Sequence, residues 1–228
     1  MSSKRYNALP KETKKLKKDI FEKLIDSVKK NCTSKFDESI DVHMQLNVKQ
    51  KKSEVNLRTA VNLPAGTGKK TKIAVVCEES KLSEAKKSGA DVIGSDDLIK
   101  EISTGKINFE KLIATPGMMI KLSKLGKILG PKGLMPNPKL GTVSDNIIET
   151  VKASKLGQIE IKNDKDGNLG FTVGKKSFSN ENLIKNFKAV LETMQKEKPS
   201  GVKGNFIKNI FITSTMGVSY KLKLDKNF

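Results

Sequence analysis

Two short stretches place charged, hydroxyl-bearing and apolar side chains close together in the sequence. Residues 35–39 read KFDES and place a lysine, an aromatic ring, two carboxylates and a hydroxyl within five positions. Residues 213–217 read TSTMG and place three hydroxyls, a thioether and a glycine together. Lysines bind phosphates, hydroxyls reach ribose, and an exposed ring or thioether acts as an apolar wedge, which favours a folded RNA recognised by shape. Each stretch alone is a weak signal, because phenylalanine and methionine are more often core residues.

A third stretch, residues 125–143 (LGKILGPKGLMPNPKLGTV), is basic and rich in glycine and proline. It cannot form one helix or one strand, because proline fixes φ and lacks a donor, while glycine opens positive φ. It also lacks the G-x-G-x-x-G pattern of dinucleotide sites. We expect a shaped corner of a domain, which contacts RNA at most secondarily. Its characteristic residues are Gly130, Pro131, Lys132, Gly133, Pro136, Asn137 and Pro138.

Other catalytic or cofactor-binding motifs are incomplete or absent in this sequence. The segment GTGKK at residues 66–70 would be a phosphate loop only with glycine at position 63 and Ser or Thr at position 70, where the chain has Leu63 and Lys70. The chain contains one histidine, His43, and two separated cysteines, Cys32 and Cys77. G-x-S-x-G and H-E-x-x-H motifs are absent from the sequence. We therefore expect no enzyme activity, no cofactor and no metal site.

The charge of the 228-residue chain points to a polyanionic partner. Lysine and arginine number 44 against 25 acidic residues, which gives a net charge of +19 and a pI of about 9.8. Nucleic acid and an acidic membrane are the partners that this charge favours, and a solvated lysine-rich surface is the alternative. The sequence shows neither the roughly 18 apolar residues that span a bilayer nor the apolar core of a signal peptide. We expect a soluble, cytoplasmic protein with no membrane partner.

The aromatic content narrows the kind of nucleic acid. The absence of tryptophan and the presence of only two tyrosines argue against a stacking platform for single strands. No helix-turn-helix or zinc-ligand spacing suits reading of the major groove. The remaining interpretation is a structured RNA bound through phosphates, ribose hydroxyls and one or two apolar wedges.

The elements that must position these residues show one pattern at both ends of the chain. There, alternating apolar residues predict strands, and apolar residues at helical spacing predict long amphipathic helices. Strands are expected over residues 40–48, 57–63, 159–161, 169–173, 206–212 and 218–224, and helices over 10–30 and 181–196. The turn signal NDKDG at residues 163–167 predicts that the strands on either side of it form a hairpin.

The middle of the chain has another pattern, in which short continuous apolar strands alternate with helices. This alternation is typical of a parallel sheet covered on both faces. Neither end alone has enough strands to bury a sheet face. We therefore predict an α+β discontinuous domain, an antiparallel sheet with helices, from residues 1–67 and 158–228. An inserted α/β Rossmann-like parallel-sheet domain would occupy residues 68–157, and the two chain crossings would form a two-domain hinge.

The chain resembles the L-one family of large-subunit ribosomal proteins, of the bacterial type, over nearly its full length. Besides KFDES and TMG, the shared motifs in family order are Leu63-Pro64 with GTGK at 66–69, GAD at 89–91, LGPKGLMPNPK at 129–139, and Gly174-Lys175 with Ser177-Phe178. The long loop is the most specific of these motifs. The resemblance implies two domains, one of them an inserted Rossmann-like domain.

The same resemblance implies a structural, non-enzymatic constituent of the large ribosomal subunit. Its implied partners are the rRNA of the mobile lateral stalk, deacylated tRNA at the exit site, whose movement and release it assists, and the mRNA of its own operon, whose translation it represses. The free protein is expected to be a monomer.

The family's RNA surface lies on the discontinuous domain. Carried over position by position, it comprises Lys35, Phe36, Asp37, Ser39, Thr213, Thr215, Met216 and Gly217, with Lys165, Lys175 and Ser177 as further candidates. One departure from the family pattern concerns this surface. Val218 stands where proline is common, which makes the chain exit from the Thr-Met-Gly turn less rigid.

Overall fold

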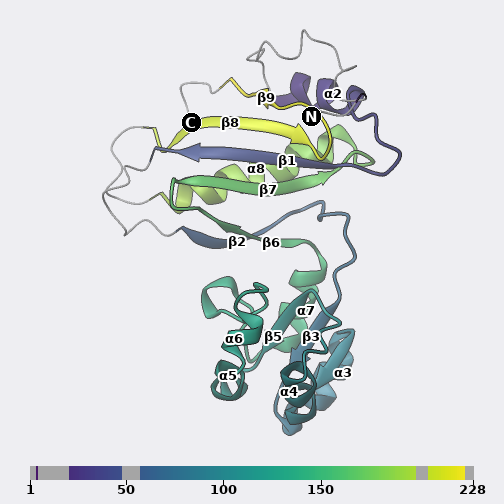
Figure 1. The fold of residues 1–228 in the computed structure, drawn as a ribbon, viewed down its shortest axis with the longest axis vertical. Coiled ribbons are helices and arrows are strands. Elements are labelled where there is room, and N and C mark those ends of the chain that lie inside the picture. The colour runs from purple at the N-terminus through teal and green to yellow at the C-terminus, as the bar shows by residue number, and fades with distance from the viewer. Residues whose placement is uncertain (1–3, 5–20, 48–56, 199–204, 224–228) are drawn as a thin grey trace. The chain divides into compact units, whose positions relative to one another are not determined.

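The computed structural model describes residues 4, 21–47, 57–198 and 205–223, and it divides into two compact units. One unit comprises Met1–Gly68 and Ile159–Phe228, and the other comprises Lys69–Gln158. The first contains an antiparallel sheet with helices, and the second contains a separate three-stranded parallel sheet (Figure 1). The predicted fold class is therefore confirmed.

The first unit is built on a sheet with strand order β7-β1-β8-β9. Strand β1 (Ser39–Leu46) lies between β7 (Asn168–Lys175) and β8 (Ile207–Ser214), and both pairings are antiparallel. The short β9 (Tyr220–Lys221) pairs with β8, so the strand expected over residues 218–224 is reduced to two residues. The alternate residues Ile40, Val42, Met44 and Leu46 of β1 are buried, as their spacing predicted.

Two helices cover the buried face of this sheet. Helix α2 (Phe21–Lys30) and helix α8 (Asn180–Lys196) share one apolar core with the inward residues of β1, β7 and β8. Their amphipathic patterns explain this placement, because each turns an apolar stripe to the sheet. The rings of Phe21 and Phe187 stack at 3.8 Å between the two helices. Of the predicted helix over 10–30, residues 10–20 lie outside the described residues, as does Val48 at the end of the first predicted strand.

The predicted hairpin across residues 163–167 is wrong. Strand β6 (Gln158–Lys162) pairs with β2 (Arg58–Asn62) in a two-stranded sheet, whereas β7 pairs with β1. A single bridge, Asn163 to Leu169, joins the two sides of the turn. The reason is burial: Leu169, Phe171 and Val173 must face the core that β1 faces, so β7 takes its place beside β1.

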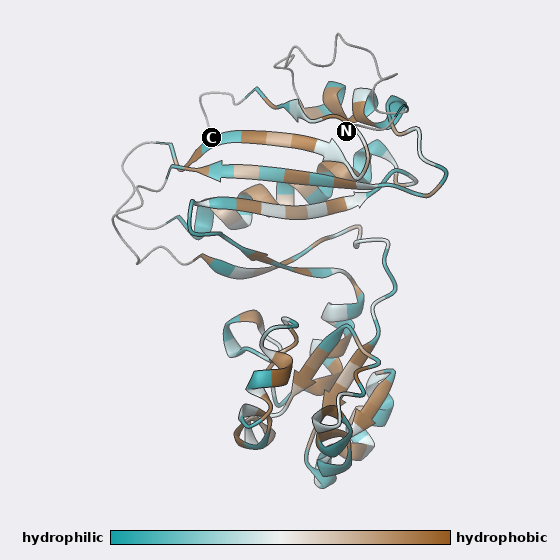
Figure 2. Ribbon diagram, in the orientation of Figure 1, coloured by the Kyte–Doolittle hydropathy of each residue, from teal (hydrophilic) through white to brown (hydrophobic). Residues whose placement is uncertain are grey.

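The second unit has the parallel strand order β4-β3-β5. Strand β3 (Ile73–Val76) is fully buried between β4 (Val92–Gly94) and β5 (Lys111–Ala114). Its residues alternate between two apolar clusters, one on each face of the sheet. Figure 2 shows these strands as a brown centre. The surrounding elements are η2 (Glu79–Lys81), α3 (Leu82–Ser88), α4 (Asp96–Ser103), α5 (Pro116–Ser123), α6 (Gly126–Leu129), η3 (Pro138–Leu140) and α7 (Ile147–Lys155).

The glycine- and proline-rich loop at residues 125–143 folds as an irregular corner of the second unit. It contains α6 and η3, and Leu129 and Leu140 are buried in it. Asn137 closes its second half, because its Oδ1 accepts from Lys139 N at 2.9 Å and its own N–H donates to Thr142 Oγ1 at 2.7 Å. The Lys132 and Lys139 side chains are exposed. The corner is thus held by apolar contacts and turn hydrogen bonds, with its lysines outside.

Candidate nucleic-acid interface

Three segments meet at one end of the four-stranded sheet of the first unit. Residues 33–38 enter β1, residues 176–178 leave β7, and residues 215–218 leave β8. The register aligns Ser39 with Lys175 and Ile40 with Ser214, so all three segments meet at the right-hand end of the sheet in Figure 1. The structure therefore brings together the candidates of the two sequence stretches, with Lys175 and Ser177 beside them.

Thr215 ties the Thr-Met-Gly turn to the start of β1. Its hydroxyl accepts from Ser39 N at 3.0 Å, and its own N–H donates to Ser39 O at 3.1 Å. The turn closes with Gly217 N donating to Ser214 O at 3.1 Å, and Val218 is buried at the exit. Thr213 Oγ1 donates to Val218 O at 3.5 Å. The valine exit is therefore fixed by packing and hydrogen bonding instead of by a proline ring.

Asp37 orders the segment that follows β7. Its two carboxylate oxygens accept from the backbone N–H of Ser177 at 3.1 Å and from the Ser177 hydroxyl at 2.8 Å. Both residues are exposed. Their pairing holds the Ser177 hydroxyl in a fixed position beside Asp37.

Glu38 is a residue of this surface that the sequence candidates omitted. It is fully buried, and its carboxylate accepts from Ser34 N at 3.0 Å and from Met216 N at 3.2 Å. Burial opposes ionisation, but hydrogen bonds from these backbone amides and from the Ser214 and Ser34 side chains outweigh it and hold the pKa of Glu38 below its ordinary value. One ionised carboxylate therefore joins the loop before β1 to the turn after β8.

A signal for Glu38 was present in the sequence. Ile40, Val42, Met44 and Leu46 occupy every second position, and Glu38 is the preceding position of the same inward series. A carboxylate in that series must be buried, and a buried carboxylate needs hydrogen-bond donors. The period of two was applied only to the apolar residues, which is why Glu38 was missed.

Apolar side chains stand exposed on this surface. Phe36 is 52% exposed and Met216 is 47% exposed, and the described residues contain only two other large hydrophobic side chains so exposed, Ile120 and Leu156 in the second unit. The Phe36 ring and the Met216 thioether are therefore both exposed, as an apolar wedge must be. Two apolar tips on a hydrogen-bonded platform are suited to inserting between or against the riboses and bases of an RNA.

The lysines around the surface divide into two groups. Lys35 is exposed, and Lys175 is half-buried. Lys176 instead donates to Cys32 O at 2.8 Å, and Lys29 donates to Phe178 O, so both fix the base of the surface. Desolvation lowers the pKa of Lys29. Lys165 lies in the turn after β6, at the opposite end of β1, because Gln45 pairs with Asn168. The structure does not bring Lys165 together with the other candidates.

Two further kinds of site, a metal-binding cluster and a membrane-spanning helix, are absent from the described residues. Among them, no group of three or more His, Cys, Asp or Glu side chains is placed to hold a metal ion. None of the helices in the described part is long and apolar enough to cross a membrane.

Comparisons with known proteins agree with this arrangement. The family model for the ribosomal protein L1p/L10e family matches residues 28–218. The chain is 63% identical to the large ribosomal subunit protein uL1 of Pelagibacter ubique over 227 residues, which cover 99% of both chains. It is 45% identical to uL1c of Phaeodactylum tricornutum, covering 98% of this chain and 97% of that protein, and 45% identical to uL1 of Kosmotoga olearia with the same coverage. As its motifs predicted, the chain belongs to the ribosomal protein L1p/L10e family, whose members are ribosomal proteins and not enzymes.

Proposed function

We propose that this protein is a structural constituent of the large subunit of the cytoplasmic ribosome, where it binds the rRNA of the mobile lateral stalk. Membership of the ribosomal protein L1p/L10e family supports the assignment to the large ribosomal subunit. The single observation that carries RNA binding is the surface at the end of β1, where exposed Phe36 and Met216 stand on a base that Glu38 and Thr215 hold together. We name this surface, formed by residues 33–39, 175–178 and 213–218, the clasp surface.

The chemistry of the clasp surface favours shape recognition of a folded RNA. Lys35 and Lys175 supply charge for phosphates, Ser177 and the threonine hydroxyls supply donors and acceptors for ribose, and the two apolar tips fill gaps in an RNA surface. The platform is pre-ordered, because its backbone donors are already paired to Asp37, Glu38 and Thr215. Pre-ordering lowers the entropy lost on binding and so favours tight, selective association.

The family resemblance supports three further parts of the proposal. The protein would assist the movement and release of deacylated tRNA at the exit site. It would repress translation of its own operon by binding an rRNA-like site on the mRNA through the same clasp surface. As a free monomer it would use two domains, residues 1–67 with 158–228 and residues 68–157, joined by a hinge.

The test is a competition assay at physiological salt. A labelled lateral-stalk RNA is bound by the protein and challenged with unlabelled stalk RNA, with the operon mRNA leader, or with a scrambled duplex of equal length. The proposal predicts displacement by the first two at similar concentrations and none by the duplex in the same range. Equal displacement by the scrambled duplex would mean generic binding of a basic protein to RNA.

A further inference from the structure

We propose that the open face of the β7-β1-β8-β9 sheet carries a second, separate RNA contact, in which His43 and Phe211 stack on unpaired bases. The proposal rests on the proposed function in taking RNA as the ligand. It adds a site for single-stranded nucleotides, a ligand class that the low aromatic content argued against.

The face is defined by the outward residues of the strands. Helices α2 and α8 cover the inward face, and on the outward face four rows of paired residues run across β1 and β8. The first row is Ser39 with Thr215, which hydrogen bonds join just beyond the end of β8. The next three rows are Asp41 with Thr213, His43 with Phe211, and Gln45 with Asn209. The first row belongs to the clasp surface. Because a strand rises about 3.3 Å per residue, the His43 row lies about 13 Å further along the same face.

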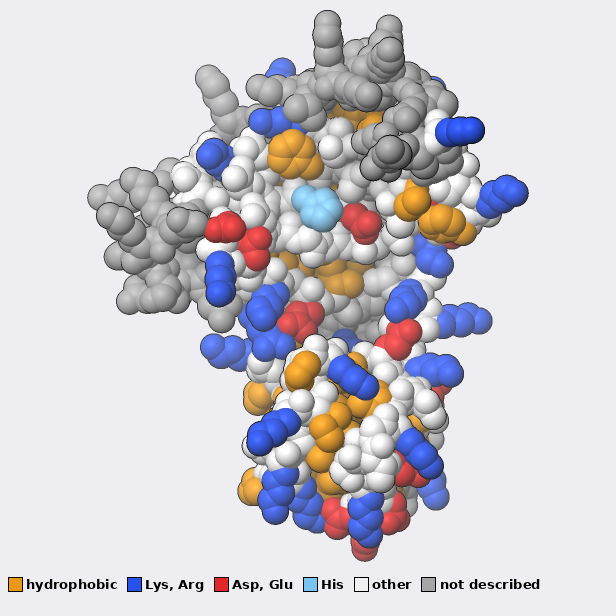
Figure 3. All heavy atoms as spheres, in the orientation of Figure 1, with side chains coloured by type: hydrophobic (Ala, Val, Ile, Leu, Met, Phe, Trp, Pro, Cys, Tyr) orange, Lys and Arg blue, Asp and Glu red, His pale blue; other side chains and the backbone are white. Residues whose placement is uncertain are grey.

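The third row gathers the stacking groups. His43 pairs with Phe211 on one side and with Gly170 of β7 on the other, and Phe211 pairs with Lys221 of β9. The Lys221 Nζ lies 5.8 Å from the centre of the Phe211 ring. The imidazole is exposed, and Figure 3 shows it, in pale blue, uncovered on the near face of the unit. The Phe211 ring is half-buried, with the ammonium over it, and the imidazole is the more exposed of the two rings. A base that stacks on these rings would meet the ammonium as a partner for its phosphate.

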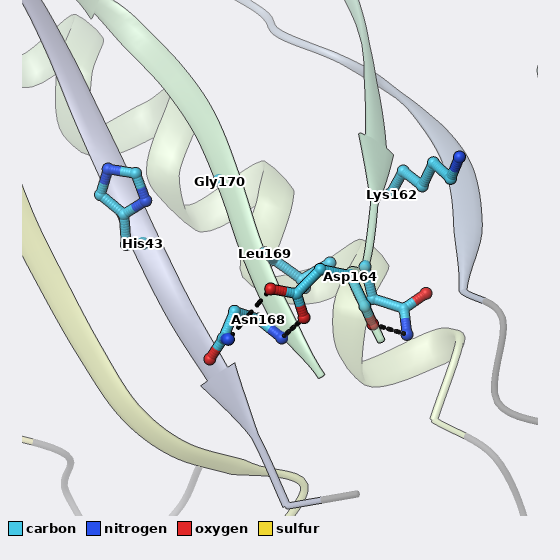
Figure 4. A pocket seen from close by; sticks show the side chains of 7 residues that line it. His43, Lys162, Asp164, Asn168, Leu169 and Gly170 are labelled. Atoms are coloured by element: carbon cyan, nitrogen blue, oxygen red, sulfur yellow. Dashed lines mark hydrogen bonds between the residues drawn. The ribbon is translucent and has the colours of Figure 1, made fainter. Parts of the chain in front are cut away.

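A shallow pocket of about 460 Å³ lies beside His43. Figure 4 shows the imidazole on one side of it and Asp164 and Asn168 on the other, with Gly170 between them. Gly170 is essential to this shape, because a Cβ there would lie 3.1 Å from His43 Nδ1. Because Gly170 has no side chain, the space beside the imidazole stays open, and a planar base can enter it against the ring.

The far wall of the pocket is rigid and polar. Asp164 accepts from Asn168 N at 2.7 Å, from Asn168 Nδ2 at 3.0 Å and from Asp166 N at 2.9 Å. Asn168 donates one amide hydrogen to Asp164, so its carbonyl oxygen and its second amide hydrogen are the groups that it can offer to a ligand. Amide and carboxylate oxygens accept hydrogen bonds from the amino and imino groups of bases. Lys162 and Lys165 are exposed at this end and supply charge for phosphates.

This set of groups fits bases better than an acidic protein segment. An acidic segment would meet the carboxylates of Asp41 and Asp164 on this face, whereas a base uses them as acceptors. A base can also stack on the rings of His43 and Phe211, and every nucleobase can do so regardless of the RNA sequence. Continuity with the clasp surface means that a strand leaving a bound stem can pass directly onto this face.

The absence of tryptophan from the chain allows a direct test. Phe211→Trp places a single fluorophore in the proposed site, and His43→Trp is a second reporter in case the first perturbs the sheet. Ile120→Trp is the matched control, because Ile120 is exposed in the second unit. Each variant is titrated with hexauridylate, with an abasic hexamer that has the same phosphates, and with hexaglutamate.

The expected result is saturable quenching of both sheet reporters by hexauridylate, with at most weak quenching by the abasic hexamer and by hexaglutamate. The Ile120→Trp control is expected to show no base-dependent quenching. In the Phe211→Trp protein, His43→Ala is expected to weaken hexauridylate binding about tenfold, as loss of one stacking partner does.

The proposal is overturned if neither sheet reporter is quenched, or if the abasic hexamer or hexaglutamate quenches as well as hexauridylate. Equal responses would identify a surface for anions and not for bases. The assay uses no stalk RNA, so its outcome is separate from that of the proposed function. If the protein does not select stalk RNA but hexauridylate still quenches the sheet reporters, only the proposed function is refuted. If the protein selects stalk RNA but the reporters are not quenched, only the stacking site is refuted.

Discussion

At the scale of single residues, the clasp surface depends on groups that do not themselves touch a ligand. Glu38 is buried beneath the two loops, and Ser214 is buried under the turn. The sequence identified the exposed residues by their types. The burial of Glu38 could have been inferred, because Glu38 continues the inward series of β1. Its hydrogen bonds to Ser34 and Met216 could not, because they form only when the loop before β1 meets the turn after β8.

Glu38→Gln is expected to weaken stalk RNA binding about tenfold and to lower the free energy of unfolding by about 1–3 kcal/mol. The amide keeps the size but replaces a charged acceptor, so the N–H groups of Ser34 and Met216 are poorly paired. Filter binding and urea unfolding measure the two effects. Glu160→Gln is the control, because the Glu160 pair with Arg58 is partly exposed and surface pairs contribute little.

The lowered pKa of Glu38 also predicts how the stability difference between wild type and Glu38→Gln depends on pH. A depressed folded-state pKa contributes stability that is present above the unfolded-state pKa, about 4.3, and is lost as the pH falls through the folded-state pKa. The difference in unfolding free energy between wild type and Glu38→Gln should therefore be constant above about pH 5 and shrink below about pH 4. A difference that grows on acidification would contradict ionisation of Glu38.

Gly217→Ala is expected to weaken RNA binding about tenfold by displacing the turn. A Cβ at this position would lie 2.3 Å from Ser214 Oγ, which is closer than real contacts allow. Ser214→Ala removes that oxygen, so the double variant should recover most of the affinity, as measured in a double-mutant cycle. Gly126→Ala is the control, since a Cβ there meets nothing within 4 Å. Additive losses in the cycle would show that the two residues do not interact.

At the scale of elements, the sequence predicted which residues of each strand face inward but not which strands are neighbours. The alternation in β1 and the continuous apolar run of β3 were both sufficient to assign burial. The partner of β7 was assigned wrongly from the turn signal, because a turn shows that the chain reverses but not that the flanking strands pair. Pairing of β7 with β1 is decided by burial of residues more than a hundred positions apart.

Helix α8 holds the segment that leaves β2 through one buried side chain. Asn186 accepts from Ala65 N at 2.9 Å and donates to Gly66 O and Val173 O at 2.9 and 2.8 Å. Asn186→Leu leaves these three backbone groups unpaired, so we expect a loss of about 2–4 kcal/mol in unfolding free energy. Hydrogen exchange should rise selectively at residues 65–66. Lys188→Ala, on the exposed part of the same helix, should change neither measurement.

At the scale of the whole molecule, composition predicted a polyanionic partner, and family membership agrees with that prediction. Composition alone could not place the contacts, because lysines are spread over both units (Figure 3). The candidate lysines of the clasp surface are Lys35 and Lys175. If these two meet phosphates, the logarithm of the binding constant should fall with the logarithm of salt concentration with a slope of about −2.

Single substitutions then show which lysines contribute to this salt dependence. Lys35→Ala should make it shallower by about one and weaken binding to different structured RNAs alike. Lys132→Ala removes an equally exposed lysine from the corner of the second unit and should leave the slope nearly unchanged. If Lys132→Ala reduces the slope as much as Lys35→Ala does, phosphate contact is not concentrated on the clasp surface.

The most direct test of the central claim is the affinity of stalk RNA for Met216→Asp compared with Ile120→Asp. Both substitutions place a carboxylate at an exposed hydrophobic position, one on the clasp surface and one in the second unit. If the clasp surface binds the stalk RNA, Met216→Asp should lower the affinity at least about 30-fold, because the carboxylate meets RNA at the centre of the contact. Ile120→Asp should change the affinity less than about threefold. Equal losses for the two variants would contradict the assignment of RNA recognition to the clasp surface.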